Sequence, residues 1–300
     1  SDELFKENAT RPEVKMIEVK LSQGAKPGHG GVLPGKKNTP EIAQIRGVKA
    51  GTTILSPPSH SSFDSPEGLL AFCDTLRELS GGKPVGFKLC IGKVEEFEDV
   101  CIAMVKTGSY PDFISIDGGE GGTGAAPLEF ANHVGLPLYV GLVLGDTLLK
   151  KHGLRDKVKI IASGKIFNGF EMLKAISLGA DLTQSARAMM LSIGCIHAQL
   201  CNTNTCPVGV ATQNKALMKG LNVNDKYVRA YNYHHNTIHA FLELMGATGC
   251  DHPDQLNPDN LKRMAEDGDV WTYTEIIASW HMVEKLTGVK ATDKAGVKSN

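Results

Sequence analysis

Short apolar runs alternate with amphipathic segments through the first two thirds of the chain, and this alternation limits the possible fold more than any other sequence feature. The apolar runs cover residues 16–21, 53–55, 86–91, 113–116, 158–162 and 180–183, and the helical segments between them include 65–79, 95–107, 169–178 and 187–193. Strands that alternate with helices at this spacing are typical of parallel sheets with crossover helices. Ser65 and Pro66 form a good helix start, because serine caps well and proline fits the first helical position. The sequence therefore predicts an α/β fold.

Small and polar residues follow the predicted strands at their carboxyl ends. These segments are 22–26, 56–58, 117–119, 163–165 and 184–186. A (β/α)8 barrel builds its active site from loops at this end of many strands. An open doubly wound sheet also places a site at the strand ends, but it does not explain why so many strands contribute. We therefore expect a (β/α)8 TIM barrel.

The predicted strands are too few to close such a barrel. Six runs are found where a closed barrel needs eight strands, and residues 1–13 are polar with no strand character. Six strands alone would leave unpaired edges. We therefore expect an incomplete barrel over residues 1–213 that lacks its first two βα units. Residues 225–245, 253–267 and 270–286 look helical and predict a C-terminal helical extension over 214–300, with a frayed polar tail from 287.

Composition excludes several classes of protein. The chain has 32 Lys+Arg and 33 Asp+Glu, which argues against a nucleic-acid-binding protein. No stretch approaches the roughly 18 consecutive apolar residues of a membrane span. Residues 1–20 are mostly polar and charged, so they carry no secretory signal. Seven cysteines, an odd number, fit a reducing compartment better than a disulfide framework, and we expect a cytoplasmic protein.

Three cysteines lie within twelve residues, at Cys195, Cys201 and Cys206, and Pro207 follows the last of them. Structural zinc sites prefer close cysteine pairs, and this segment has none. Loop cysteines with a proline after the last one are typical of iron–sulfur sites. Three thiolates suit a three-iron cluster, or a four-iron cluster with an outside ligand such as Cys250. Three unrelated buried cysteines are the alternative, because free cysteine packs as a small hydrophobic residue.

Glycine-rich loops follow the later strands. Residues 117–124 read DGGEGGTG, residues 162–164 end the next strand, and residues 184–187 end the last one. Glycine lets backbone amides approach a ligand closely, and loops after the last two strands of a barrel commonly hold a phosphate. Each loop alone is equally consistent with a tight turn. Together they predict a phosphate-bearing cofactor.

Basic residues occupy positions where a charge needs a partner. Lys88 lies inside a predicted strand, so its ammonium either meets an anion or a polarised group or extends to the barrel rim. In a cofactor barrel Lys88 could stabilise a reduced, anionic flavin ring. Lys20, Gln23 and Lys26 cluster near another strand end, and Arg46 follows the Pro/Gly-rich residues 27–37. These residues suit a dicarboxylate substrate, with isolated surface charges as the alternative.

Several of these motifs together resemble the FMN-binding synthase domain of the glutamate synthase family. The segments that carry the resemblance are LSQGAKPGHGGVLPG at 21–35, LSPP at 55–58, GGEGGTGAAP at 118–127 and CIHAQLCNTNTCPVGVATQ at 195–213. The resemblance covers residues 18–213 and fits the smaller FMN-binding relatives better than the large multidomain enzymes. It implies a (β/α)8 barrel that binds FMN and a three-iron, four-sulfur cluster, and it implies reduction of 2-iminoglutarate, formed from 2-oxoglutarate and ammonia, to L-glutamate.

The resemblance also implies roles for individual residues. Cys195, Cys201 and Cys206 would bind the cluster in the loop 195–206, and Lys88 and Lys26 would be catalytic. The substrate would contact Lys20, Gln23, Lys26 and Arg46. The cofactor would contact Lys88, Asp117, Gly118, Gly119, Gly164, Lys165, Gln184 and Ser185. An electron-donor protein or subunit and a separate amidotransferase would be partners.

Two positions depart from the family pattern GAKPGEGGQLPG. This chain has His29 in place of Glu and Val32 in place of Gln, and Val32 lacks an amide that could bond the substrate. A second hypothesis is therefore the same machinery acting on another amino or oxo acid. The missing strands motivate a third, a catalytically silent electron-transfer or assembly module.

Overall fold

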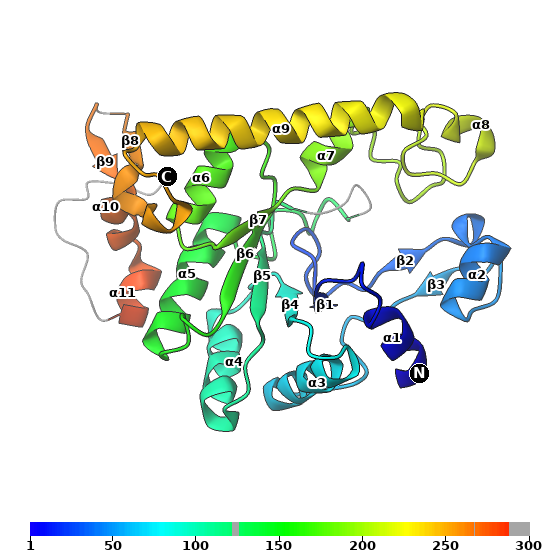
Figure 1. Ribbon diagram of the computed structural model, residues 1–300, viewed down its shortest axis with the longest axis horizontal. Coiled ribbons are helices and arrows are strands. Elements are labelled where there is room, and N and C mark those ends of the chain that lie inside the picture. Colours follow the sequence, from blue (N-terminus) through cyan, green and yellow to red (C-terminus); the bar gives the residue numbers. More distant parts are fainter. Residues whose placement is uncertain (122–125, 267, 288–300) are drawn as a thin grey trace.

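A curved parallel sheet with helices on one face forms the centre of the molecule (Figure 1). The computed structural model describes residues 1–121, 126–266 and 268–287. Its sheet has the order β1 (Ile17–Lys20), β4 (Val85–Leu89), β5 (Phe113–Asp117), β6 (Lys159–Ser163) and β7 (Leu182–Gln184), with every neighbouring pair parallel. The helices that follow β4, β6 and β7 are α4 (Val94–Thr107), α6 (Gly169–Ser177) and α7 (Arg187–Ser192). The predicted α/β class is confirmed.

The two faces of this sheet differ in polarity. Val19, Phe87, Ile114 and Ile160 point to one face, where they pack in a single apolar core with residues of α3 (Pro66–Leu79), α4, α5 (Leu138–Lys151) and α6. Because side chains alternate along a strand, the intervening positions point to the opposite face. These positions carry the polar residues Glu18, Lys20, Lys88, Ser115, Asp117, Ser163 and Gln184. Burial of the apolar face thus presents a polar surface on the inner side of the curved sheet.

The predicted helices and strands of this core are present within a few residues of their expected bounds. Ser65 caps α3 as expected, since its Oγ accepts a hydrogen bond from the Gly68 amide at 3.2 Å. Helix α5 was not predicted from the sequence. It is apolar on nearly all sides, so it lacks an amphipathic pattern, and it lies buried between β5 and its neighbours. Gly145 of α5 permits this packing: a Cβ there would come within 2.5 Å of Ile116.

One predicted strand is not part of the parallel sheet. Residues 53–55 contain β3 (Ile54–Leu55), which pairs in antiparallel fashion with β2 (Val32–Leu33) in a separate two-stranded sheet. The strand is short, its Leu55 is exposed, and Pro57 and Pro58 follow it closely. Together with the 3-10 turn Gly35–Lys37 and α2 (Pro40–Arg46), these strands form an excursion, residues 22–56, that Figure 1 shows to one side of the main sheet. The expected count of six sheet strands is therefore wrong, and five are described.

Within the described residues, β1 and β7 have no further strand beside them, so the sheet is not closed. Helix α1 (Asp2–Ala9) precedes β1 and contacts α3 near the amino-terminal end of the sheet. The incomplete barrel predicted from the sequence agrees with this arrangement.

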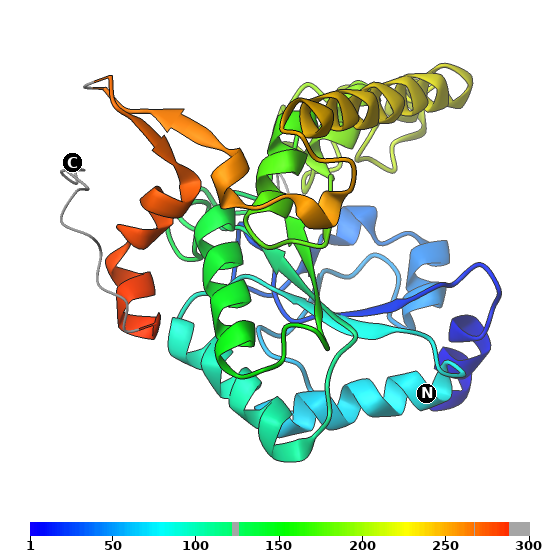
Figure 2. The same ribbon diagram turned by 60° about the vertical axis from the view of Figure 1, so that its left-hand side comes forward.

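The C-terminal extension begins with α8 (Lys215–Met218) and the long helix α9 (Val223–Ala247), which crosses α6 and α7 (Figures 1 and 2). Gly169 of α6 lies against α9 so closely that a Cβ would meet the Phe241 amide at 2.5 Å. A second apolar cluster packs at this contact. It is formed by Leu173, Phe241, Met245, Cys250, Leu256 and Leu261. The extension therefore packs directly on the barrel helices.

The helix predicted over residues 253–267 is wrong. Two 3-10 turns, Pro253–Gln255 and Pro258–Asn260, lead into β8 (Lys262–Met264), which pairs with β9 (Val270–Thr272). Each proline starts a new turn after a capping residue, and this interrupts a continuous helix. The helix predicted over 270–286 begins only after β9, as α10 (Tyr273–Ala278) and α11 (His281–Thr287). Residues 288–300 of the predicted frayed tail lie outside the described residues.

None of the described helices is both long and apolar enough to cross a membrane.

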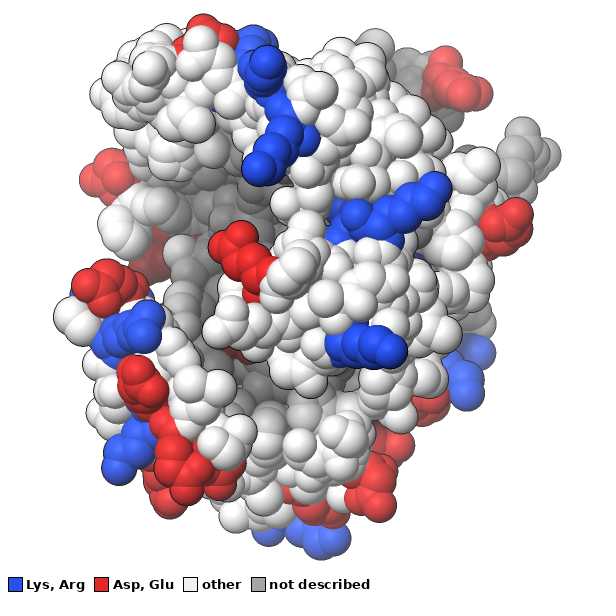
Figure 3. Space-filling view, turned by 90° about the vertical axis from the view of Figure 1, so that its right-hand side faces the viewer, with Lys and Arg blue, Asp and Glu red and all other residues white. Residues whose placement is uncertain are grey.

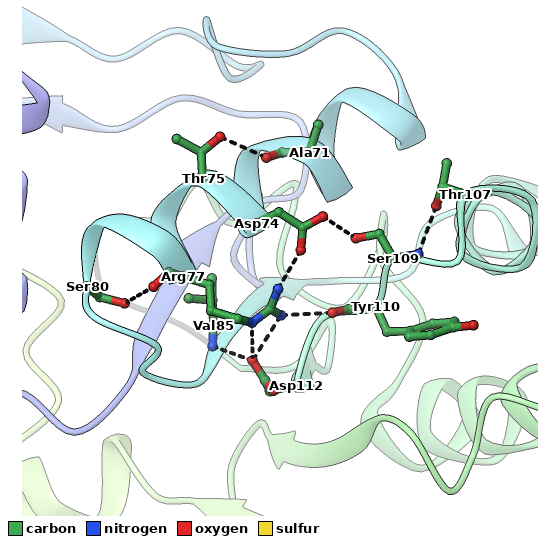
Figure 4. A network of polar contacts seen from close by, with 10 residues as sticks. All are labelled: Ala71, Asp74, Thr75, Arg77, Ser80, Val85, Thr107, Ser109, Tyr110 and Asp112. Atoms are coloured by element: carbon green, nitrogen blue, oxygen red, sulfur yellow. Dashed lines mark hydrogen bonds and ion pairs between the residues drawn. The ribbon is translucent and has the colours of Figure 1, made fainter.

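Arg77 ties α3 to the amino-terminal end of the sheet (Figure 4). Its guanidinium donates to Asp112 Oδ2 at 3.0 Å and to the Tyr110 carbonyl at 2.9 Å, and it also pairs with Asp74. Asp112 in turn accepts the Val85 amide at 2.7 Å. This network lies at the end of the sheet where barrel folds concentrate stability rather than chemistry.

Replacing Arg77 should therefore destabilise the fold. We expect Arg77→Met to lower the free energy of unfolding by about 1–3 kcal/mol, because it leaves half-buried carboxylates without their partner. The control Lys93→Met removes the exposed pair with Glu96, at 3.4 Å, and should cost less than about 0.5 kcal/mol. Urea unfolding measures both. Equal losses in the two variants would contradict a structural role for the Arg77 network.

Candidate active site

A buried network of opposite charges occupies the inner face of the sheet. Lys88 Nζ on β4 lies 2.9 Å from Glu18 Oε1 on β1. Glu18 also accepts a hydrogen bond from Ser115 Oγ on β5 at 2.6 Å, and the Gln184 side chain on β7 lies near enough to help lower the pKa of its carboxyl group. Because β1 and β7 are the two edges of the described sheet, the contact between Glu18 and Gln184 spans its concave side. The curvature of the sheet thus brings four strands to one carboxylate.

The electrostatics of Glu18 follow from these contacts. Burial alone would raise the pKa of its carboxyl group, but the hydrogen bonds from Ser115 and Lys88, the charge of Lys88 and the nearby Gln184 side chain outweigh that effect and lower the pKa. The carboxylate is therefore the stable form at neutral pH, and it supplies the anion that Lys88 requires at a strand position. Lys88 was predicted from the sequence to need such a partner, whereas Glu18 was not identified as part of the site.

Two further lysines lie near this pair. Burial lowers the pKa of Lys20, and the positive charges of Lys88 and Lys26 lower it further. Lys26 is only 7% exposed, and within the described residues its ammonium makes no hydrogen bond or ion pair. An ammonium on a largely buried side chain, without a protein partner, is suited to an anionic ligand. The structure thus brings Lys88 near the Lys20 and Lys26 cluster expected from the sequence.

The first loop, residues 21–26, follows β1 and meets the glycine-rich loop through Asp117. This buried carboxylate, at the end of β5, accepts the Gly24 amide at 2.7 Å and the Ser163 hydroxyl at 2.9 Å. Burial raises its pKa, and the hydrogen bonds from Gly24 and Ser163 only partly oppose this effect. Gly24 has no room for a side chain, because a Cβ there would lie 1.8 Å from the Gly118 carbonyl oxygen. Gln23 belongs to the same turn, and its carbonyl accepts the Lys26 amide at 3.0 Å.

The glycine-rich loop is partly described. Gly118 and Gly119 are buried, and the Glu120 carboxylate accepts the amide of Leu138 at the start of α5 at 2.9 Å. Residues 122–125 of the resemblance segment 118–127 lie outside the described residues. Glu120 was not identified from the sequence. Its hydrogen bond with the Leu138 amide connects the glycine-rich loop to the start of α5.

The expected phosphate loops lie side by side. Gly164 and Lys165 follow β6, Gln184 and Ser185 end and follow β7, and Ser163 is in register with Gln184. Both Gly164 and Lys165 have positive φ, at 138° and 52°. Gly164 packs against Gly118, and Ser185 Oγ donates to the Ile166 carbonyl at 2.8 Å.

Arg46 lies apart from these residues. It ends α2 on the excursion and is exposed, and no described contact joins it to the lysines. His29 also lies in the excursion, where its ring meets Phe130 edge-on with centroids 5.2 Å apart. Val32 is half-exposed in β2.

Figure 3 shows the face that carries α2 and α8. This face is hollowed, with acidic and basic side chains around the hollow.

The three cysteines of the loop 195–206 line one pocket. Cys195, Cys201 and Cys206 share it with Arg187, His197 and the apolar side chains of Ile196, Leu200 and Val208. Cys250, the outside ligand considered for a four-iron cluster, lies instead in the apolar cluster between α6 and α9. Cys73, Cys90 and Cys101 are buried in the core region, as predicted. All seven cysteines are free thiols.

Backbone amides around this pocket lie close to two of the three sulfurs. Burial opposes ionisation of Cys206, but hydrogen bonds from the amides of Ala211, Val208, Val210 and Gly209 lower its pKa. The His197 amide likewise donates to Cys195 Sγ at 3.4 Å. No three His, Cys, Asp or Glu side chains in the described residues converge on one point as ligands of a single metal ion would. In iron–sulfur clusters the cysteine ligands are distributed over several iron atoms.

A model of the conserved region in glutamate synthase matches residues 9–251. The chain belongs to the glutamate synthase family. It is 42% identical over 275 residues to the glutamate synthase large subunit-like protein YerD of Bacillus subtilis, covering 92% of this chain and 52% of that protein. It is 38% identical over 234 residues to the archaeal-type glutamate synthase (NADPH) of Thermotoga neapolitana, covering 78% and 45%. The chain thus spans about half the length of these relatives.

A solved structure supports the fold of this glutamate synthase family member. A flavocytochrome b2 variant with benzoylformate superimposes with a TM-score of 0.50, covering 86% of this chain and 50% of that chain at 15% identity. The described sheet and its helices therefore follow the TIM-barrel type of α/β fold seen in that structure.

Gly24 should be intolerant of a side chain. We expect Gly24→Ala to displace the first loop from Gly118, to cost about 1–3 kcal/mol of stability, and to weaken ligand binding at the lysines. Gly92→Ala is the matched control, because a Cβ at Gly92 meets nothing within 4 Å. Urea unfolding and ligand titration compare the two variants. An unchanged Gly24→Ala would contradict the close contact.

Glu18 should make stability depend on pH in a defined direction. A carboxylate with a lowered pKa stabilises the fold above its ordinary value of 4.5 and loses this contribution as the pH falls through its lowered folded-state value. We expect the stability difference between the wild type and Glu18→Gln to be constant from pH 7 to about 5.5 and to shrink below 4.5. Urea unfolding across this range measures the difference, with the exposed Glu13→Gln as control. A difference that grows on acidification would refute the assignment.

Proposed function

We propose that this chain is the synthase part of a flavin and iron–sulfur oxidoreductase of the glutamate synthase type. It reduces 2-iminoglutarate, formed from 2-oxoglutarate and ammonia, to L-glutamate. The observation that carries the proposal is the convergence of Lys20, Lys26 and Lys88 at the carboxyl ends of the strands, with the Lys26 side chain largely buried and its ammonium without a hydrogen bond or ion pair in the described residues. Membership of the family supplies the reaction type.

The lysines would bind the carboxylates of the substrate. Lys26 and Lys20 are the charges available for this, whereas Lys88 is already neutralised by Glu18 at 2.9 Å. The mutual repulsion that lowers the pKa of Lys20 is relieved when an anion enters. Gln23 and Arg46 remain proposed substrate contacts, and Arg46 would have to reach the site from α2.

The residues at the strand ends fit FMN. Gly164, Lys165, Gln184 and Ser185 offer paired loops after adjacent strands for its phosphate, and Gly118 and Gly119 leave the backbone accessible beside Asp117. Lys88, held by Glu18, would lie by the flavin ring and offset negative charge there. Bound FMN would supply hydride to the imine carbon. The protein's own contribution is to orient the substrate through its carboxylates and to keep water out of the polar cleft.

The cysteine loop fits a three-iron, four-sulfur cluster. Cys195, Cys201 and Cys206 would be its ligands, and the amides of residues 208–211 would hydrogen-bond to the Cys206 sulfur. Bound there, the cluster would carry electrons to the flavin. Relatives are named for NADPH or ferredoxin, so an electron-donor protein or subunit is a proposed partner. A separate amidotransferase would supply ammonia, and the free thiols fit the cytoplasm.

A second candidate is the same chemistry on another oxo acid. It rests on His29 and Val32, which follow Lys26 along the excursion; the His29 amide donates to the Lys26 carbonyl at 3.2 Å. The lysines recognise a carboxylate, which every 2-oxo acid has. The excursion residues would instead contact the distal part of the substrate, so a change there alters substrate choice and leaves the reaction type unchanged.

The visible spectrum of the intact protein, with FMN, iron and sulfide quantified, tests the proposal first. We expect one FMN and three irons per chain, and a colourless, metal-free protein would favour the silent electron-transfer or assembly module. Lys26→Met should raise the KM for 2-oxoglutarate at least about tenfold, because a charged hydrogen bond is worth about 1.5–3 kcal/mol. The exposed Lys49→Met serves as control. Activity with several 2-oxo acids but none with 2-oxoglutarate would select the second candidate.

A further inference from the structure

We propose that Lys37 is a positioning residue for the cysteine loop, and that its ammonium sets the reduction potential of the cluster bound there. This inference rests on the proposed function for the presence of a cluster. Lys37 ends the 3-10 turn of the excursion, 158 residues before Cys195 in the sequence, and sequence reasoning gave it no role. Its side chain is half-buried against the cysteine loop.

The ammonium of Lys37 joins this loop to the residues that follow it. Its Nζ donates to the Cys201 carbonyl at 2.9 Å and to the Ala211 carbonyl at 3.1 Å. Cys201 is a proposed ligand, and Ala211 supplies one of the amides that hydrogen-bond to the Cys206 sulfur. One cation therefore holds, through their backbone, residues that fix the positions of two of the three sulfurs.

Further hydrogen bonds hold both the excursion and the cysteine loop in place around this contact. On the excursion side, the buried Asn38 side chain donates to the carbonyls of Lys49 and Thr52 at 2.8 and 2.9 Å, which closes the excursion on itself. On the loop side, the Asn204 side chain donates to the Lys36 carbonyl at 3.3 Å, and its carbonyl oxygen accepts the Gln213 amide at 2.7 Å. Lys37 therefore bridges two segments that are each held in shape by their own hydrogen bonds.

The charge has an electrostatic consequence. Reduction adds an electron to a cluster, and a fixed positive charge beside it favours the reduced form. The reduction potentials of iron–sulfur clusters depend on net charge and on hydrogen bonds around the sulfurs. Lys37 affects both, because it adds a charge next to the loop and holds the backbone that donates to Cys206.

The experiment compares Lys37→Met, Lys37→Arg and Lys36→Met in the intact protein. Lys36 is the matched control, because it is adjacent and exposed and its side chain makes no contact within the described residues. An EPR-monitored redox titration should show a more negative midpoint potential for Lys37→Met, a value near the wild type for Lys37→Arg, and no change for Lys36→Met. A wild-type midpoint in Lys37→Met, or an equal shift in Lys36→Met, would overturn the proposal.

A second readout does not need the cluster. In metal-free protein, we expect chymotrypsin to cleave after the half-exposed Leu200 about 5–30-fold faster in Lys37→Met than in the wild type, because the loop opens more often. Lys37→Arg and Lys36→Met should cleave at the wild-type rate. Equal cleavage rates in all four proteins would refute the positioning role. If the wild type binds no iron, the proposed function fails, and the cleavage rates still decide whether Lys37 holds the loop.

Discussion

The half-buried ion pair between Glu18 and Lys88 is the interaction on which the arrangement of the site depends. A carboxylate on the inner face of a sheet loses hydration, and this loss is tolerated only when several donors replace water. Glu18 meets this requirement with Lys88 on β4 and Ser115 on β5 as donors, and the curvature of the sheet also brings the Gln184 side chain on β7 near it. The same curvature places the ends of the strands around one cleft. The electrostatic requirement of one residue and the shape of the fold are therefore linked.

Close backbone packing then connects this face to the loops above it. Gly24 can approach the Gly118 carbonyl only because Gly24 has no side chain, and in this position its amide donates to Asp117. The first loop therefore lies at a fixed height over β5, with Lys26 at its end. Had this contact been looser, the Lys26 stem would be solvated and its ammonium could turn away from the cleft. The burial of Lys26 is thus a consequence of glycine positions elsewhere in the chain.

Sequence reasoning identified the features that depend on local pattern. The alternation of apolar and amphipathic segments, with the helix start at Ser65 and Pro66, predicted the strands and helices of the core. The spacing of the three cysteines indicated residues that line one pocket. It failed where tertiary contacts decide: residues 53–55 have strand character but pair with Val32 and Leu33 outside the main sheet. Prolines at 253 and 258 mark the interruption of the expected helix. Glu18 could have been recognised, because it alternates with Val19 beside Lys20, whereas the contact of Lys37 with residues far along the chain has no local signal.

The excursion connects the proposed substrate site with the cysteine loop. It begins at the lysine-bearing turn with Lys26, a proposed substrate contact, and through Lys37 it reaches the cysteine loop. The Asn38 side chain closes the part of the segment that follows Lys37. Binding of an anion at Lys26 would therefore act on a segment that also bears the charge beside the proposed cluster. Because coupling between two sites is reciprocal, the redox state of the cluster would then alter the affinity for the anion by the same factor as the anion alters the cluster's reduction equilibrium.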